Sequence, residues 1–256
     1  MSPVWRKSLV ALGFLLLWEL GARYVNTPLL LPTFSDTAKA LWQALGASGD
    51  ASILRYVGET AKTLFSGFLL GSLVAAVLTI LAINTKVGED ALSLITGGFA
   101  PLPAVAIFPL ALMFFGISYK SLLFIAAFAT VFPVALAMNQ GFRTVNPTLR
   151  QVGLNLGMSG LELTLKVLIP CALPAILAGL RNGFSNSFRA LVAVEMVIGA
   201  ATGRGGLGWY VVASKQNLDI PEVYAGIIAI MVIGLLFEGC FKWIEAKTVR
   251  RWGMLT

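Results

Sequence analysis

Long apolar runs separated by short polar segments dominate this sequence. No charged side chain interrupts residues 63–85 or residues 121–142. A helix needs about 20 apolar residues to cross the hydrocarbon core of a membrane, so each of these runs is long enough to span it. An earlier run, Ser8–Trp18, follows two basic residues. We interpret it as an uncleaved first helix, because the residues after it make a poor signal-peptide cleavage site.

Three more runs complete the pattern, and one of them is broken by prolines. The uncharged run Ala91–Tyr119 contains Pro101 and Pro103. A broken helix is tolerated in a membrane where the freed backbone meets protein or a water-filled path. Further spans are predicted at residues 173–200 and at about 222–242. The chain is therefore predicted to be an all-α polytopic membrane protein with about six transmembrane helices.

The stretch between the first two spans mixes polar and apolar residues. Asp36 is predicted to cap a short amphipathic helix that runs through Leu45. The sequence shows no low-complexity tract, linker or clear internal repeat. Residues 1–256 are therefore predicted to form a single transmembrane domain.

The composition supports a membrane environment. Of the 256 residues, 57% are hydrophobic and 12% are charged, and the mean hydropathy is +0.84. A soluble domain carries roughly 25% charged residues, so this chain has too few to cover a water-exposed surface. Histidine is absent, which excludes histidine-based catalysis and histidine metal ligands. The two cysteines are far apart and predict neither a disulfide framework nor a zinc site.

The basic residues predict the orientation of the chain. The net charge is +7, but Lys and Arg are scattered among apolar runs, so no nucleic-acid partner is expected. Cytoplasmic loops of membrane proteins carry an excess of Lys and Arg. The strongest local cluster, from Lys242 to Arg251, follows the last span. It places the C-terminus in the cytoplasm, and an even number of spans places the N-terminus there too.

Two nucleotide-binding patterns bear on enzymatic function, and neither indicates an enzyme. Residues 203–208 match G-x-G-x-x-G, but that pattern needs a preceding strand and a βαβ unit to bind a dinucleotide. We predict a glycine turn there instead. The phosphate-loop pattern G-x-x-x-x-G-K-[ST] is absent from the sequence, so this chain is not expected to hydrolyse ATP by itself.

The segment Thr148–Glu162 lies between two predicted spans and is unusually rich in leucine. Leu154, Leu161, Leu165 and Leu168 follow one another at helical spacings of 7, 4 and 3 residues. This spacing predicts a cytoplasmic amphipathic helix that needs an apolar partner surface. That surface is either the lipid interface or a groove in another protein.

The same segment resembles the signature of permease subunits of binding-protein-dependent ABC importers. That signature reads Glu-Ala-Ala, three residues, Gly, nine residues, then Ile-x-Leu-Pro. This chain has Gln151–Gly153, three residues, Gly157, nine residues, and then Val167–Pro170. The glycine, the spacing and the final proline match, whereas Gln-Val-Gly stands in place of the Glu-Ala-Ala triplet.

The resemblance extends along most of the chain. Leu30–Leu41 is similar to the family's outer loop, and Pro103–Gly116, with the sequence Phe114–Ile117 at its end, is similar to its third span. Leu191–Glu195 and Gly206–Gly208 resemble later signature residues. The closest subgroup imports nitrate, sulfonates, taurine and related small organic compounds.

The resemblance implies a type I ABC importer permease with the MetI-like fold, in the bacterial inner membrane with both termini cytoplasmic. Two permease chains, expected to be identical, would form the path for a small anionic or polar solute. Two ATP-binding cassette ATPase chains would bind beneath them, and an external solute-binding protein would deliver the solute. ATP would be used by the ATPases. This chain is then expected to be a transport subunit, not an enzyme, and to bind no cofactor or metal.

The family's coupling helix is implied to lie within roughly residues 148–162. The residues implied to couple this chain to an ATPase are Gln151, Gly153, Gly157, Leu161 and Pro170. Gly157 is expected to permit a tight turn and a close approach of the backbone.

Two ionisable residues, Arg189 and Glu195, lie within the fifth predicted span. Such groups are costly inside a membrane and usually face the bundle interior or a wet cavity. Because they are six residues apart, they point to different sides of a helix and are not expected to pair. Both are candidates for the substrate path, where Arg189 would attract an anion. The alternative is a structural role, which for Arg189 would be an ion pair with Glu238.

A different class of function stays open on the residues alone. A secondary carrier would usually show inverted repeats and intramembrane acids for ion coupling. The sequence offers one candidate acid, Glu195, and no clear repeat. A membrane-embedded enzyme would need a cluster of catalytic side chains near one face. Co-purification of an ATPase would separate a permease from both alternatives.

Overall fold

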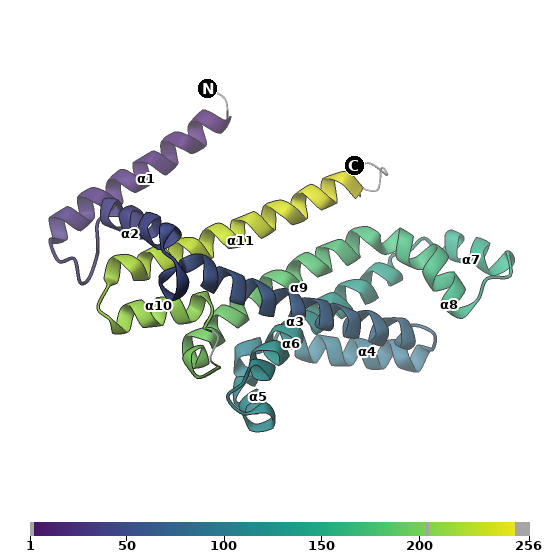
Figure 1. Ribbon diagram of the computed structural model, residues 1–256. Helices are drawn as coiled ribbons and strands as arrows, with labels where there is room; N and C mark the ends of the chain where they lie inside the picture. Colours follow the sequence, from purple (N-terminus) through teal and green to yellow (C-terminus); the bar gives the residue numbers. More distant parts are fainter. Residues whose placement is uncertain (1–2, 203–204, 249–256) are drawn as a thin grey trace. The chain divides into compact units, whose positions relative to one another are not determined.

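The computed structural model describes residues 3–202 and 205–248, and every regular element in these ranges is a helix (Figure 1). The α-helices are α1 (Pro3–Val25), α2 (Phe34–Gly46), α3 (Ile53–Ala82), α4 (Lys86–Phe99), α5 (Phe108–Phe115), α6 (Tyr119–Arg143), α7 (Pro147–Asn155), α8 (Gly160–Leu163), α9 (Ile169–Ile198), α10 (Leu207–Gln216) and α11 (Ile220–Thr248). Shorter turns of helix are η1 (Gly49–Ala51), η2 (Ala104–Ile107), η3 (Thr164–Leu168) and η4 (Ala200–Thr202).

The predicted spans are present. Within the described ranges, five helices are long and apolar enough to cross a membrane, and a bent pair can complete a sixth span. The pair consists of Lys86–Phe99 and Ala104–Phe115, whose axes differ by 92°. Pro101 and Pro103 lie in the break, where proline lacks an N–H and disfavours helix in the residue before it. The predictions of an all-α class and about six spans are confirmed.

The chain divides into two compact units. The first comprises Met1–Thr60 and Glu195–Ile233, and the second comprises Ala61–Val194 and Gly234–Thr256. In the first unit, Ile53 and Leu207 are at most 1% exposed and belong to a core that includes Ala44 and Tyr210. Burial of these side chains joins α2, the start of α3 and α10.

Helix α6 forms the centre of the second unit. Of its most apolar 18 residues, 56% are buried, a larger share than in any other described span. Two neighbouring helices approach it through glycines. A β-carbon placed on Gly71 of α3 would lie 2.5 Å from the Ala127 carbonyl oxygen, and one on Gly183 of α9 would lie 2.9 Å from Val134 Cγ2. Small residues allow the close approach that drives packing between membrane helices.

Helix α2 starts earlier than predicted. Thr33, not Asp36, is its N-cap, and the Thr33 hydroxyl oxygen accepts a hydrogen bond from the Asp36 amide at 3.1 Å. Asp36 is the third residue of the helix, and its carboxylate accepts a hydrogen bond from the Thr33 hydroxyl at 2.7 Å. A carboxylate in the first turn also interacts favourably with the helix dipole.

Helix α10 is not predicted from the sequence. It begins inside the glycine-rich motif 203–208, with Gly206 as its N-cap and Leu207 and Gly208 as its first residues. Gly203 and Arg204 of that motif lie outside the described residues. No strand precedes the motif in the described part of the chain, so the structural context that a dinucleotide site requires is not found there.

Candidate functional site

The segment predicted to couple to an ATPase is a helical hairpin, not one continuous helix. Helices α7 and α8 are joined by residues 156–159, and α7 lies against α8 and η3 (Figure 1). Gly153 lies at this contact, where an added β-carbon would be 2.5 Å from Leu163 Cδ1. The hairpin therefore depends on a residue without a side chain at position 153.

Gly157 ends α7 with a tight turn. Its φ is +81°, a conformation that residues with a β-carbon rarely adopt. The Gly157 amide donates to the Leu154 carbonyl at 3.0 Å, and the Met158 amide donates to the Gly153 carbonyl at 3.1 Å. These two hydrogen bonds form a Schellman motif, in which glycine is the favoured residue. The turn reverses the chain so that α8 runs back along α7.

The hairpin carries an exposed apolar surface. Six of its leucine and valine side chains are between 48% and 70% exposed, whereas Leu163 is buried against α7. This hairpin surface consists of Leu149, Val152, Leu154, Leu156, Leu161 and Leu165. Several large apolar side chains exposed on one short segment are typical of a site of contact with a protein or a membrane. The polar side chain of Gln151 is exposed beside it.

Pro170 lies just after the hairpin, at the start of α9. The preceding turn η3 is a π-helix, in which the Ile169 amide donates to the Thr164 carbonyl. Proline has no N–H, and its ring collides with the carbonyl oxygen four residues earlier in an ordinary α-helix. A wider π turn before Pro170 relieves both problems. The structure thus places four predicted coupling residues in the hairpin and the fifth directly after it, while their contact with an ATPase stays a prediction.

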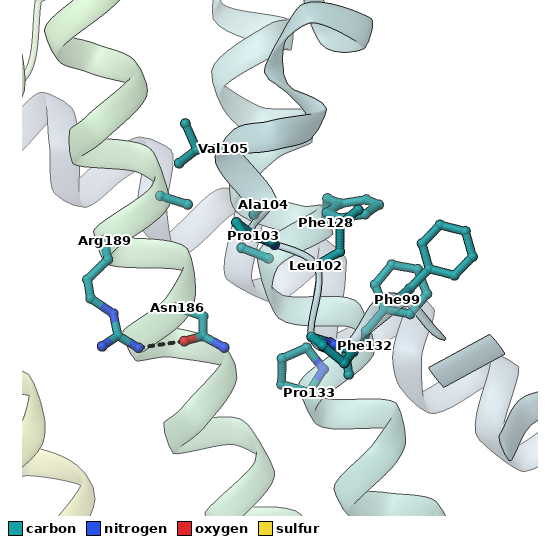
Figure 2. Close-up of a pocket in the computed structure, with 14 residues that line it drawn as sticks. Phe99, Leu102, Pro103, Ala104, Val105, Phe128, Phe132, Pro133, Asn186 and Arg189 are labelled. Carbon is teal, nitrogen blue, oxygen red and sulfur yellow. Dashed lines mark hydrogen bonds between the residues drawn. The ribbon is translucent and has the colours of Figure 1, made fainter. Parts of the chain in front are cut away.

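Arg189 lies on α9 beside a cavity of about 370 Å³ (Figure 2). Its Nη2 donates a hydrogen bond to Asn186 Oδ1 at 2.6 Å. Asn186 is one helical turn earlier, so the two side chains share a face of α9. In the described part of the chain, no acidic side chain forms an ion pair with Arg189.

The suggested structural partner of Arg189 binds a different arginine. Glu238 on α11 accepts hydrogen bonds from Nε and Nη2 of Arg181, with an Nε–Oε2 distance of 2.9 Å. Glu245 lies 3.7 Å from Arg181 Nη1, and Lys242 lies 3.5 Å from Glu238. The structural ion pair considered for Arg189 is therefore made by Arg181.

Glu195 is buried in the first unit, with 2% of its surface exposed. Its carboxylate accepts hydrogen bonds from the Thr60 hydroxyl at 2.9 Å and from the Gly208 amide at 3.1 Å. The Thr60 oxygen in turn accepts a hydrogen bond from the Leu207 amide at 2.8 Å. A β-carbon on Gly206 would collide with Glu195 and Thr60. These contacts tie α3 and α9 to the start of α10, where a negative charge also suits the helix dipole.

Three contact residues are not predicted from the sequence: Thr60, Arg181 and Asn186. Arg181 gave a usable signal, because it is a charged residue in a predicted span. Thr60 lies 135 positions from Glu195, and nothing in the local pattern connects them. The sequence gives no signal for Asn186, which is an ordinary polar residue. Its role becomes visible only from the cavity, whose lining shows which face of α9 it occupies.

Comparisons with known proteins place these features in a family. Residues 22–250 match the family described as "Binding-protein-dependent transport system inner membrane component". A putative ABC transporter permease protein of Methanocaldococcus jannaschii is 33% identical over 241 residues, which cover 94% of this chain and 89% of that protein. The taurine transport system permease protein of Escherichia coli is 29% identical over 228 residues, which cover 86% of this chain and 80% of that protein.

The arrangement of helices also matches a solved structure. An inward-facing conformation of the MetNI methionine ABC transporter aligns with a TM-score of 0.56 and 16% sequence identity. The alignment covers 85% of this chain and 98% of that chain. At this identity the likeness shows the fold alone. It confirms the predicted type I ABC importer permease (MetI-like) fold.

Proposed function

This chain belongs to the family of binding-protein-dependent transport system inner membrane components, and within that family we propose that it imports a small anionic or polar solute. It is a multi-pass membrane protein and a permease subunit of an ABC importer. Relatives are named for taurine, aliphatic sulfonates, nitrate and bicarbonate. We infer that the solute is a sulfonate, taurine, nitrate or a related organic compound.

The observation that carries the proposed coupling role is the hairpin surface. Its exposed leucines and Val152 belong to a compact hairpin that Gly153 and Gly157 shape. An apolar surface on a short helical hairpin fits a groove in a partner protein. We propose that this surface binds an ATPase subunit, and that residues 148–162, together with Pro170, transmit its movement to the spans.

The remaining partners follow from the same proposal. Two copies of this chain form the path, and each receives one ATPase through its hairpin. An external solute-binding protein delivers the solute to the pair. ATP is bound and hydrolysed by the ATPases, because no phosphate-loop pattern occurs in this chain. Closure of the ATPases moves the hairpins, and the spans then switch access from one side of the membrane to the other.

We further propose that residues 1–256 act as one transmembrane domain with both termini in the cytoplasm. Support comes from the basic cluster that begins at Lys242 and Lys247 after the last span. The end of this cluster, Arg250 and Arg251, lies outside the described residues. Labelling of a cysteine placed at Ser2 or Thr256 from outside intact cells would contradict this orientation.

The two residues predicted for the substrate path receive different support. Arg189 borders a cavity and has no acidic partner among the described residues, so we propose that it faces the path. The Glu195 carboxylate is buried and already occupied by hydrogen bonds from Thr60 and Gly208. For Glu195 the geometry supports the structural alternative.

The proposed coupling is tested by replacing Gly157 with tryptophan in the full complex. A residue with a β-carbon at a positive φ costs roughly 1–2 kcal/mol, and the bulky ring disturbs the hairpin surface. We expect Gly157→Trp to insert into the membrane but to lose most solute uptake, with ATPase that either no longer co-purifies or hydrolyses ATP without transport. Gly49→Trp is the matched control, because Gly49 has φ +66° and open space around it but lies outside the hairpin.

Two results would count against the coupling role. Uptake and ATPase co-purification equal to those of Gly49→Trp would contradict it directly. A second contrary result is that Gly157→Trp binds the ATPase normally and that lipid alone protects the hairpin from labelling. That result would favour an interfacial helix. The alternative of a stand-alone carrier or a membrane-embedded enzyme is not favoured, because the family match covers residues 22–250.

A further inference from the structure

A cavity of about 370 Å³ lies beside Arg189 in the second unit, and the coupling role of the hairpin does not account for it. One wall is the break between α4 and η2, which includes Pro101 and Pro103 (Figure 2). The other walls come from α6 and from Asn186 and Arg189 on α9. A broken span that borders a cavity is the arrangement in which non-helical backbone is tolerated at membrane depth.

The cavity has one charged residue among the described side chains that line it, Arg189. A guanidinium group has five N–H donors, and within the described part of the chain Arg189 has one hydrogen-bond partner, Asn186. Glu238, the acid considered as its partner, is held by Arg181. A guanidinium with free donors binds carboxylate, sulfonate or phosphate groups through two parallel hydrogen bonds. The charge therefore favours a ligand with an acid group.

The remaining side chains that line the cavity are apolar, and three of them are phenylalanine rings. The rings of Phe99 and Phe132 stack with centroids 5.0 Å apart, and Phe128 meets Phe132 edge-on at 5.0 Å. Pro101 and Pro103 contribute no amide donors. Apart from Asn186 and Arg189, no side chain that lines the cavity can hydrogen-bond a hydrated inorganic ion in place of the water that the ion would lose. A hydrocarbon chain or a flat ring has no hydrogen bonds to water that need replacing, and it can pack against these side chains.

Packing against α6 fixes the position of the charged end. The Ser187 hydroxyl donates to the Ala126 carbonyl of α6 at 2.9 Å. Gly183, one turn earlier, brings α9 close to Thr130 and Val134 of the same helix. The stretch of α9 that carries Asn186 and Arg189 is thus held before a ligand arrives. Preorganisation of this kind lowers the entropy cost of binding.

We propose that this cavity is a binding site for a small organic anion, with one acid group on an apolar or planar body. Arg189 binds the acid group, Asn186 orients the guanidinium, and the proline–phenylalanine wall holds the body. The inference rests on the proposed function, because it gives the permease a solute-selecting site of its own in addition to that of the proposed external solute-binding protein. The volume lies at the lower end of the roughly 300–1,000 Å³ typical of organic ligand sites. A water molecule occupies about 30 Å³ of liquid, so nitrate or bicarbonate would leave most of the space unfilled.

Direct binding to the full chain, purified with its subunits into phosphatidylcholine nanodiscs, tests this site. The probes are benzenesulfonate, benzoate and hexanesulfonate as organic anions, nitrate as an inorganic anion, and methyl phenyl sulfone as a neutral analogue. We expect at least one organic anion to bind saturably, with nitrate and the sulfone unable to displace it. Arg189→Gln should weaken that binding roughly tenfold or more, because a charge-assisted hydrogen bond is lost.

Two controls separate the site from general effects. Arg6→Gln removes an exposed arginine elsewhere and should leave probe binding unchanged. Val105→Trp should fill the apolar end of the cavity and weaken binding of the organic anions, whereas Val87→Trp, at another exposed position, should not.

Several outcomes would overturn the assignment. One is that no organic anion binds, and another is that nitrate displaces the probe as well as the probe displaces itself. A third is loss of probe binding in nanodiscs that contain phosphatidylglycerol, which would assign the same chemistry to a membrane lipid. None of these results changes ATPase co-purification through the hairpin. Failure of the cavity proposal is therefore distinguishable from failure of the coupling role.

Discussion

Glu195 and Arg189 belong to the same helix, α9, but to different compact units of the chain. Glu195 is 2% exposed and accepts hydrogen bonds from Thr60 and Gly208. Arg189 is exposed, and its recorded partner is the neutral Asn186. Arg181, two turns before Arg189, is paired with Glu238 although both side chains are 31% exposed. A charge in a span indicates a ligand site only when the chain itself leaves the charge without a counter-charge.

The largest effect on stability is expected at the buried carboxylate. Glu195→Ala would leave the Gly208 amide and the Thr60 hydroxyl without their acceptor and would open a small void. We expect the free energy of unfolding to fall by roughly 3 kcal/mol, seen as a lower midpoint of thermal unfolding in detergent. Glu162→Ala removes an exposed carboxylate from α8 and should change stability by less than about 0.5 kcal/mol. If the two variants are equally stable and Glu195→Ala loses uptake, Glu195 acts in the substrate path and not as a structural residue.

An intermediate effect is expected at Arg181. Arg181→Gln would leave Lys242, 3.5 Å from Glu238, as the remaining cation beside that carboxylate among the described residues. Because the pair is partly exposed, we expect a loss of roughly 1 kcal/mol rather than the larger cost of a fully buried pair. The double variant Arg181→Gln with Glu238→Gln should recover part of that loss in the same thermal assay. No recovery would show that Arg181 stabilises the chain by packing or through Glu245, 3.7 Å from its Nη1, and not through Glu238.

The smallest effect on stability is expected at Arg189. Arg189→Gln breaks no ion pair found among the described residues, so the unfolding midpoint should shift by less than the equivalent of about 0.5 kcal/mol. Uptake of an anionic solute should nevertheless weaken. The comparison fails if Arg189→Gln destabilises the complex as much as Arg181→Gln does, since that result would reveal an acidic partner on another subunit.

The spans could be predicted because each is a long apolar run that ends at charges or prolines. The break near Pro101 and Pro103 was also predictable, since proline cannot continue a helix without losing a hydrogen bond. The hairpin was not fully predictable. Leucine spacing suggested one helix through Leu154 and Leu161, whereas Gly157 adopts φ +81° and reverses the chain between them. The sequence around a glycine can look the same whether the glycine lies inside a helix or caps its end. Only the backbone angles distinguish the two.

The pairing of charges could not be predicted from the sequence at all. Arg181 and Arg189 differ by eight positions on one helix, and only the packing of α9 decides which of them meets Glu238. Small residues at 179, 183 and 187 recur every four positions, the spacing expected for a helix face packed against a neighbour. Packing of this stripe against α6 determines the faces of α9 on which Arg181 and Arg189 lie. The sequence alone does not show that α6 is the helix packed against it.

The helical run from Gly160 to Ile198 has a mechanical consequence. It covers 39 residues without an intervening loop, joining α8, η3 and α9. At 1.5 Å per residue, Arg189 lies about 44 Å along this helical run from the hairpin turn. Movement of the hairpin can therefore reach the cavity wall through backbone that stays helical, with the π turn η3 and the prolines at 170 and 174 as the points where the run can bend. If the hairpin binds an ATPase as proposed, one continuous helical run carries the ATPase contact near its start and the charged residue of the cavity near its end.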